Sequence, residues 1–369
     1  MIDKVQMKVG ILTYHHTTNY GATLQAYALQ KAVKSRGHSC ELIDYRPIAA
    51  VEFYRKDIYP VRASRHWLSC VAKSWKMTRF LRSQTQLSRD KTYTRDNIKA
   101  KFQHYDAVIT SSDEVWKIKS VRGYDPSYFL DFIYKPDTLK ISYAPSFGNL
   151  DTLGAEREDI CRLIHDFDSL SGRDANSLRL LENECNKQAT RVLDPTFLTN
   201  YEDILVKPRL KKDYLLIYYE TRLKEEQEAF IKEVARIKKL TIVSIGYYNQ
   251  VADINLVGVS PQEWLGYFAN ASYVITNFFH GTVFSIIFRK PFTVFSNKYK
   301  VRKVGDLLNH LGLGDHIILT EADSKLFAGN YLEIDYSPVL PKLELEIQKS
   351  QNFLSSALSA NSASTFQKL

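Results

Sequence analysis

Short apolar stretches alternate with longer stretches in which apolar positions recur every three or four residues. In the first half, this pattern predicts a helix over 23–35 that ends before Gly37, and strands over 8–14, 40–45, 105–110 and 140–144. A strand–helix–strand repeat of this length is typical of a parallel sheet with helices on its faces. Clusters of polar residues and glycine follow these strands, and they should therefore meet at one edge of the sheet.

A second sheet is predicted after the polar linker 207–212. Its strands are expected over 214–219, 240–245, 273–276 and 292–295, and its helices over 223–239 and from Pro261 onward. The fold class is therefore α/β, with two doubly wound Rossmann-like domains. We place the domains at 1–205 and 206–340, followed by a C-terminal helix and tail over 341–369.

The segment 53–102 differs from its surroundings because it is rich in Lys and Arg and poor in acids. Trp67, Leu68, Val71 and Trp75 are interleaved with these bases. This composition predicts an inserted basic amphipathic helix or helix pair, of the kind that binds peripherally to membrane surfaces. Alternatively, the aromatic side chains pack on their own domain while the bases face water.

The charge and cysteine content narrow the classes of function. A net charge of +9 favours anionic substrates, anionic lipid or nucleic acid. Since no nucleic-acid motif accompanies the charge, we expect no nucleic-acid partner. The N-terminus does not resemble a signal peptide, so we expect a cytoplasmic protein. The four cysteines are scattered without a Cys-x-x-Cys pair, which predicts reduced thiols and no metal site.

Candidate chemistry lies where a strand meets a helix at His280. The apolar strand 273–275 leads into Thr276–Phe284, and an apolar helix follows. Free amides and the positive end of a helix favour an anion, and a nearby imidazole can carry protons. The alternative is a histidine that caps its own helix. The turn at Asn19–Ala22 lies at another strand end, but it has one glycine where a dinucleotide fingerprint needs three.

Five motifs in the same order resemble the polysaccharide pyruvyl transferase family over nearly the full chain. They are Val9–Tyr14 with Asn19–Gln30, Ser111–Trp116, Ser171–Asp174, Val192–Thr196, and His280–Phe288 with Lys290–Phe292. Some positions depart from the pattern. Glu114 and Lys117 replace the usual Gln and Asn, and Phe278 and Phe279 stand where many relatives have an Arg before the His.

The resemblance implies a GT-B-like arrangement of two domains facing a cleft. It implies transfer of pyruvate from phosphoenolpyruvate, as co-substrate and without a further cofactor, onto two sugar hydroxyls as a cyclic ketal. The acceptor would belong to a surface polysaccharide or its lipid-linked precursor, with the enzyme cytoplasmic and peripheral on the inner membrane face. His280 would be the acid/base. The expected substrate-binding residues are Arg173, Arg302, Gly281 and Thr282 for the donor, Asn19, Tyr20 and Gly21 at the rim, and Ser112 and Asp113 for acceptor hydroxyls.

Other interpretations stay open. Arg173 could instead form an ion pair with Asp174 or a neighbour, Asp113 could cap the segment that follows it, and His15 and His16 are expected only to line a pocket. At the level of the whole protein, one alternative is a nucleotide-sugar-dependent GT-B glycosyltransferase. Another is a non-catalytic, membrane-associated partner in polysaccharide assembly, and nucleic-acid binding ranks last.

Overall fold

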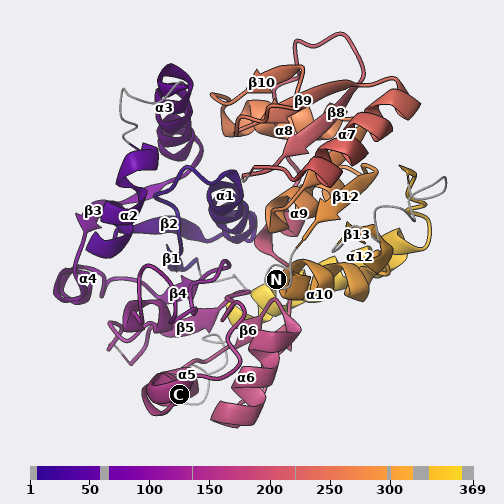
Figure 1. Ribbon diagram of the computed structural model, residues 1–369. Coiled ribbons are helices and arrows are strands. Elements are labelled where there is room, and N and C mark those ends of the chain that lie inside the picture. Colours follow the sequence, from indigo (N-terminus) through magenta and orange to yellow (C-terminus); the bar gives the residue numbers. More distant parts are fainter. Residues whose placement is uncertain are drawn as a thin grey trace. The chain divides into compact units, whose positions relative to one another are not determined.

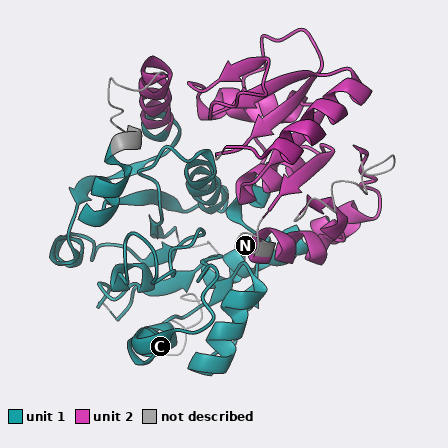
Figure 2. Ribbon diagram, in the orientation of Figure 1, with its two compact units in different colours: residues 1–56, 81–199, 344–369 teal, residues 57–80, 200–343 magenta. Residues whose placement is uncertain are grey.

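The computed structural model describes residues 6–58, 66–134, 136–220, 222–296, 301–318 and 332–359. The chain forms two compact units (Figure 2). Unit 1 comprises residues 1–56, 81–199 and 344–369, and unit 2 comprises 57–80 and 200–343. The described stretch 344–359 thus belongs with the first unit, and part of the basic segment belongs with the second.

Unit 1 is built on a five-stranded parallel sheet in the order β3-β2-β1-β4-β5 (Figure 1). Its strands are β1 (Lys8–Leu12), β2 (Ser39–Tyr45), β3 (Leu87–Thr92), β4 (Ala107–Thr110) and β5 (Leu139–Ser142). Strand order reverses between β1 and β4, and such a switch point is where open α/β sheets bind ligands. A two-stranded sheet pairs β6 (Ser171–Gly172) with β7 (Thr190–Arg191).

Helix α1 (Tyr20–Lys34) is buried along most of its length and packs its alanine and leucine side chains on this sheet. The other helices of unit 1 are α2 (Ile48–Ile58), α4 (Arg95–Lys101), α5 (Arg157–His165), α6 (Ala175–Cys185) and most of α12 (Val339–Ala357), with 3₁₀ turns at Pro126–Phe129, Gly154–Glu156 and Pro195–Leu198.

The prediction that all the cysteines are reduced is wrong. Cys161 and Cys185 form a disulfide because α5 packs against α6, which brings their Cα atoms to 4.9 Å.

Unit 2 carries a six-stranded parallel sheet in the order β10-β9-β8-β11-β12-β13. Its strands are β8 (Tyr214–Tyr218), β9 (Thr241–Ile245), β10 (Ile254–Leu256), β11 (Tyr273–Thr276), β12 (Phe292–Phe295) and β13 (Ile317–Ile318). Its helices are α7 (Glu225–Lys238), α8 (Pro261–Asn270), α9 (Phe279–Ile287) and α10 (Val301–Leu311), with a 3₁₀ turn at Gly314–His316. Strand order reverses between β8 and β11, so the β11–α9 junction lies at the switch point of this sheet.

The basic segment is not a simple helix pair. It contains the end of α2, then α3 (Trp67–Gln84), the edge strand β3 and the short helix α4. The strand arises because Leu87–Thr92 pairs in parallel with β2. Residues 67–80 of α3 belong to unit 2, where Ser69 and Ala72 pack so closely on Gly258 that a Cβ there would lie 2.8 Å from the Ser69 carbonyl oxygen. Within the described ranges, no helix has the length and apolar character needed to cross a bilayer.

Candidate functional site

In unit 1, the expected rim residues Asn19, Tyr20 and Gly21 form the start of α1. Asn19 is the N-cap, and its Oδ1 accepts hydrogen bonds from the amides of Gly21 (2.9 Å) and Ala22 (3.4 Å). Tyr20 is fully buried. These contacts are those of a tight turn between a strand and a helix. A substrate role for these three residues stays a prediction.

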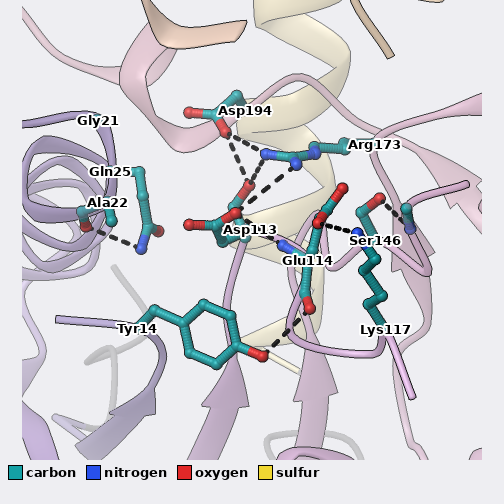
Figure 3. Close-up of polar contacts among 12 residues, drawn as sticks. Tyr14, Gly21, Ala22, Gln25, Asp113, Glu114, Lys117, Ser146, Arg173 and Asp194 are labelled. Atoms are coloured by element: carbon teal, nitrogen blue, oxygen red, sulfur yellow. Dashed lines mark hydrogen bonds and ion pairs between the residues drawn. The ribbon is translucent and has the colours of Figure 1, made fainter. Parts of the chain in front are cut away.

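A buried polar network follows β4, and it joins three of the motifs (Figure 3). Arg173 Nη1 donates to Asp194 Oδ2 and to Ser112 Oγ, each at 3.2 Å, and Ser112 Oγ donates to the same carboxylate oxygen at 2.7 Å. The other oxygen of Asp194 accepts from the amide and the hydroxyl of Thr196. Since the side chains of Arg173 and Asp194 are only 3% and 1% exposed, this ion pair is an interior feature.

Asp113 is the solvent-facing carboxylate of this region. Its side chain is 22% exposed and its Oδ1 lies 4.0 Å from Arg173 Nη2. It also accepts a hydrogen bond from the amide of Glu114 at 2.8 Å, as the capping alternative expects. The backbone φ of Asp113 is +96°, and that of Ala144, after β5, is +57°. Such conformations are costly for residues other than glycine and cluster at functional sites.

Gln25 of α1 ties together the ends of β1 and β4. Its Nε2 donates to Thr13 Oγ1 (2.7 Å) and to the Ala22 carbonyl (3.1 Å), while its Oε1 accepts from Ser111 Oγ (3.1 Å). Gln25 and Asp194 lie within two of the motifs, but the sequence alone predicts no role for either residue. An uncharged amide inside a helix and an aspartate before proline are both common for structural reasons. Neither residue therefore carries a local sequence signal for the buried contacts that it makes.

His15 and His16 line a small cavity beside β1, as expected. The His15 ring lies between the Thr13 carbonyl (3.1 Å) and Asp44 Oδ1 (3.0 Å), and Arg46 forms two hydrogen bonds to the same carboxylate. Burial raises the pKa of Asp44, but His15 and Arg46 more than offset this and hold it well below its usual range. Burial, and then the charge of Arg46, lowers the pKa of His16 to about 3.

In unit 2, His280 occupies the first turn of α9 at the carboxyl end of β11. Its residue is only 7% exposed. The position after it must be glycine, because a Cβ on Gly281 would lie 2.1 Å from Thr276 Oγ1. That Oγ1 donates to the Tyr218 carbonyl and accepts from the Phe278 amide, while Thr282 Oγ1 bonds back to the Phe278 carbonyl. The strand end and the helix start are thus held together, and His280 is placed in the first turn of α9.

Phe278, one of the two residues at the place of the relatives' arginine, belongs to an aromatic cluster. Its ring centroid lies 4.3 Å from that of Tyr218 and 5.5 Å from that of Tyr247. A buried cation lies beside it, because Lys73 Nζ donates to the Gly246 carbonyl (3.1 Å) and lies 4.3 Å from the centre of the Tyr247 ring. From the sequence pattern, Lys73 is expected among the surface bases, and the pattern gives no sign of this buried position. Arg302 is on α10 with an exposed side chain.

Of the predicted site residues, unit 1 contains Arg173, Ser112, Asp113 and Asn19, whereas unit 2 contains His280, Gly281, Thr282 and Arg302. Among the residues that the structure describes, no group of three or more His, Cys, Asp and Glu side chains could hold a metal ion.

Comparison with known families matches the chain to one model, polysaccharide pyruvyl transferase, over residues 19–299. The chain belongs to the polysaccharide pyruvyl transferase family. No curated protein matches the sequence. Membership confirms the resemblance seen in the motifs, and with it the coarse function of a transferase that acts on a saccharide.

Solved structures confirm the fold. A protein of Listeria monocytogenes described as a UDP-N-acetylglucosamine 2-epimerase has a TM-score of 0.54 at 11% identity, covering 99% of this chain and 98% of that one. UGT89C1 of Arabidopsis thaliana, complexed with quercetin, has a TM-score of 0.51 at 11% identity and covers 96% and 100%. MnaA of S. aureus with UDP gives 0.51 at 12% identity and covers 96% and 94%. At such identities the likeness establishes the GT-B type of fold and nothing of the ligand.

Proposed function

We propose that this member of the family transfers pyruvate from phosphoenolpyruvate to two hydroxyls of a saccharide, forming a cyclic ketal. The observation that carries the proposal is His280, a buried histidine that the family match covers and that α9 holds at the switch point of its sheet. A helix N-terminus favours an anionic donor, and a positioned imidazole can move protons. Gly281 and Thr282, through the first turn of α9, and the exposed Arg302 are the proposed donor contacts in unit 2.

The proposed reaction begins with protonation of the methylene carbon of phosphoenolpyruvate by the His280 imidazolium. The adjacent carbon becomes electrophilic, a sugar hydroxyl attacks it, and the neutral imidazole takes up the hydroxyl proton. The C–O bond to phosphate then breaks, the second hydroxyl closes the ring, and its proton leaves with the phosphate. The products are the pyruvate ketal and inorganic phosphate. Serving as acid and then as base is ordinary behaviour for a histidine at neutral pH.

The acceptor is proposed to be a saccharide of a surface polysaccharide or its lipid-linked precursor. Asp113 is the unit 1 residue best suited to its hydroxyls, because its carboxylate faces solvent while Ser112 and Arg173 are engaged by Asp194. A carboxylate accepts hydrogen bonds from hydroxyl groups and repels an anionic donor.

A lipid-linked acceptor would place the enzyme at the inner membrane face, and the outer side of α3 fits such a surface. Leu68, Val71 and Trp75 are 73%, 38% and 59% exposed and follow each other at helical spacing on one side. The stretch 58–89 contains seven Lys and Arg and no Asp or Glu. Apolar side chains flanked by bases are attracted to anionic lipid. Lys76 is unavailable for this contact, since it pairs with Glu263 at 2.7 Å.

The decisive experiment is incubation with phosphoenolpyruvate and a panel of lipid-linked and nitrophenyl sugars. Release of phosphate together with the mass gain of a ketal on one sugar would support pyruvyl transfer. Turnover of a nucleotide sugar, with no reaction or binding of phosphoenolpyruvate, would contradict it and favour a glycosyltransferase.

A further inference from the structure

Arg122 is an arginine with no carboxylate in direct contact, although the charge of Asp113 acts on it from beyond ion-pair distance. It lies in the loop after Trp116 and is half-buried. Its guanidinium carbon is 3.5 Å from the centre of the Tyr14 ring and 5.3 Å from that of Tyr54. An arginine that is stacked at 3.5 Å is held flat, so the direction of its N–H donors is largely set before any ligand arrives.

No carboxylate among the described residues forms an ion pair with Arg122, and its buried Nε makes no hydrogen bond to them. The tyrosines do not supply the missing charge. Burial raises the pKa of Tyr14, so its phenol is neutral, and its hydroxyl donates to the Glu114 carbonyl at 3.2 Å. The other two buried arginine sites nearby differ in this respect, since Arg46 pairs with Asp44 and Arg173 with Asp194.

The site borders the end of the sheet where ligands of this fold class bind. Arg122 lines a cavity with Tyr14, His16, Arg46 and Tyr128, following the carboxyl ends of β1 and β2. The cavity holds about 20 Å³, enough for one water-sized group rather than a sugar ring. It could therefore receive only the tip of a larger ligand, such as one oxygen of a carboxylate or phosphate.

Burial disfavours the Arg122 cation, and stacking on tyrosine together with the charge of Asp113 offsets this, but neither takes the hydrogen bond that its buried Nε can donate. We infer that Arg122 is an anion-binding residue of unit 1, and that it takes the carboxylate or phosphate group of a substrate. Tyr14 positions the guanidinium by stacking. Two sources share this chemistry. One is phosphoenolpyruvate, which rests on the proposed function, and the other is an acidic group on the saccharide acceptor, which does not.

The test compares Arg122→Gln with Arg122→Lys and with the control Arg179→Gln, which removes an exposed arginine from α6 of the same unit. Calorimetry with phosphoenolpyruvate, inorganic phosphate and glucuronate measures binding without relying on turnover. For any of these anions that binds the parent protein, Arg122→Gln should lower the affinity by about 10- to 100-fold, because charge-assisted hydrogen bonds are lost. Arg122→Lys should recover part of that loss, and Arg179→Gln should match the parent.

The identity of the weakened ligand separates the two sources. Selective loss of phosphoenolpyruvate and phosphate binding assigns Arg122 to the donor, whereas selective loss of glucuronate binding assigns it to an acidic acceptor even if phosphoenolpyruvate is not a substrate. Binding unchanged in a folded Arg122→Gln, or a parent protein that binds none of the three anions, would overturn the inference. A melting temperature lowered equally in Arg122→Gln and Arg122→Lys, with the binding constants intact, would show a structural role instead.

Discussion

Replacing Arg173 with Met tests whether this arginine holds the unit 1 network together or serves mainly as a substrate ligand. In the folded protein its guanidinium lies between Ser112 and Asp194. The substitution keeps a long apolar side chain but removes the positive charge that Arg173 places beside the Asp194 carboxylate, which is 1% exposed. We therefore expect the variant to unfold more easily than the parent.

The size of the loss can be worked from the contacts. Breaking a buried ion pair by removing one partner costs about 3–5 kcal/mol. Asp194 would keep its hydrogen bonds from Ser112 Oγ and from the amide and hydroxyl of Thr196, which favours the lower end of that range. At roughly 2–4 °C per kcal/mol for a unit of this size, the melting temperature should fall by about 6–20 °C.

The assay is thermal and urea unfolding of Arg173→Met, Asp194→Asn and the double variant, with Arg179→Met as the matched control on the surface. Since the double variant removes both charges of the pair, its loss of stability should be clearly smaller than the sum of the two single losses. An Arg173→Met protein that melts with the parent but binds phosphoenolpyruvate more weakly would refute this reasoning. It would return Arg173 to the role of donor ligand.

Three further predictions follow from particular contacts. His280→Ala should lower turnover by ~10²–10⁴-fold with an unchanged melting temperature, and near-native turnover in a folded variant would remove His280 from the mechanism. Gly281→Ala should destabilise unit 2 by ~1–3 kcal/mol, measured by urea unfolding, because its Cβ would lie 2.1 Å from Thr276 Oγ1; a stability equal to that of the parent would show that the helix start can shift. Trp75→Ser should weaken sedimentation with anionic vesicles at low salt, whereas Ile237→Ser, at a similarly exposed apolar side chain, should not. A parent protein that does not sediment would end the membrane proposal.

The regular helices and strands could be predicted from the sequence because their apolar positions repeat with a clear period and a capping or turn residue marks where each one begins or ends. Strand β11 was expected over the residues that form it, and α8 begins at Pro261 with the capping serine before it. Short edge strands could not be predicted in this way. β3 contains three charged residues in six and pairs on only one side, so its sequence resembles a loop.

For the unit 1 residues of the candidate site, their position at strand ends was predictable from the sequence, but their contacts were not. Sequence motifs placed Ser112, Asp113 and Arg173 at strand ends, and the structure brings them together. It also shows that Arg173 is engaged by Asp194, a partner 21 positions away that the local sequence does not indicate. Pairing between residues distant in sequence depends on the tertiary fold, and so does the disulfide between Cys161 and Cys185.

Helix α3 shows why a charge pattern alone cannot identify a binding surface. Lys73 and Trp75 are two positions apart and look equally suited to a membrane, yet they lie on different sides of the helix. Lys73 is buried against Gly246 and Tyr247, whereas Trp75 is more than half exposed, with Arg79 stacked 5.3 Å from its ring. Charge reversal at Lys73 would therefore destabilise unit 2 and could be mistaken for loss of membrane binding. Only substitutions on the outer side of α3, such as Trp75→Ser, can separate the two effects.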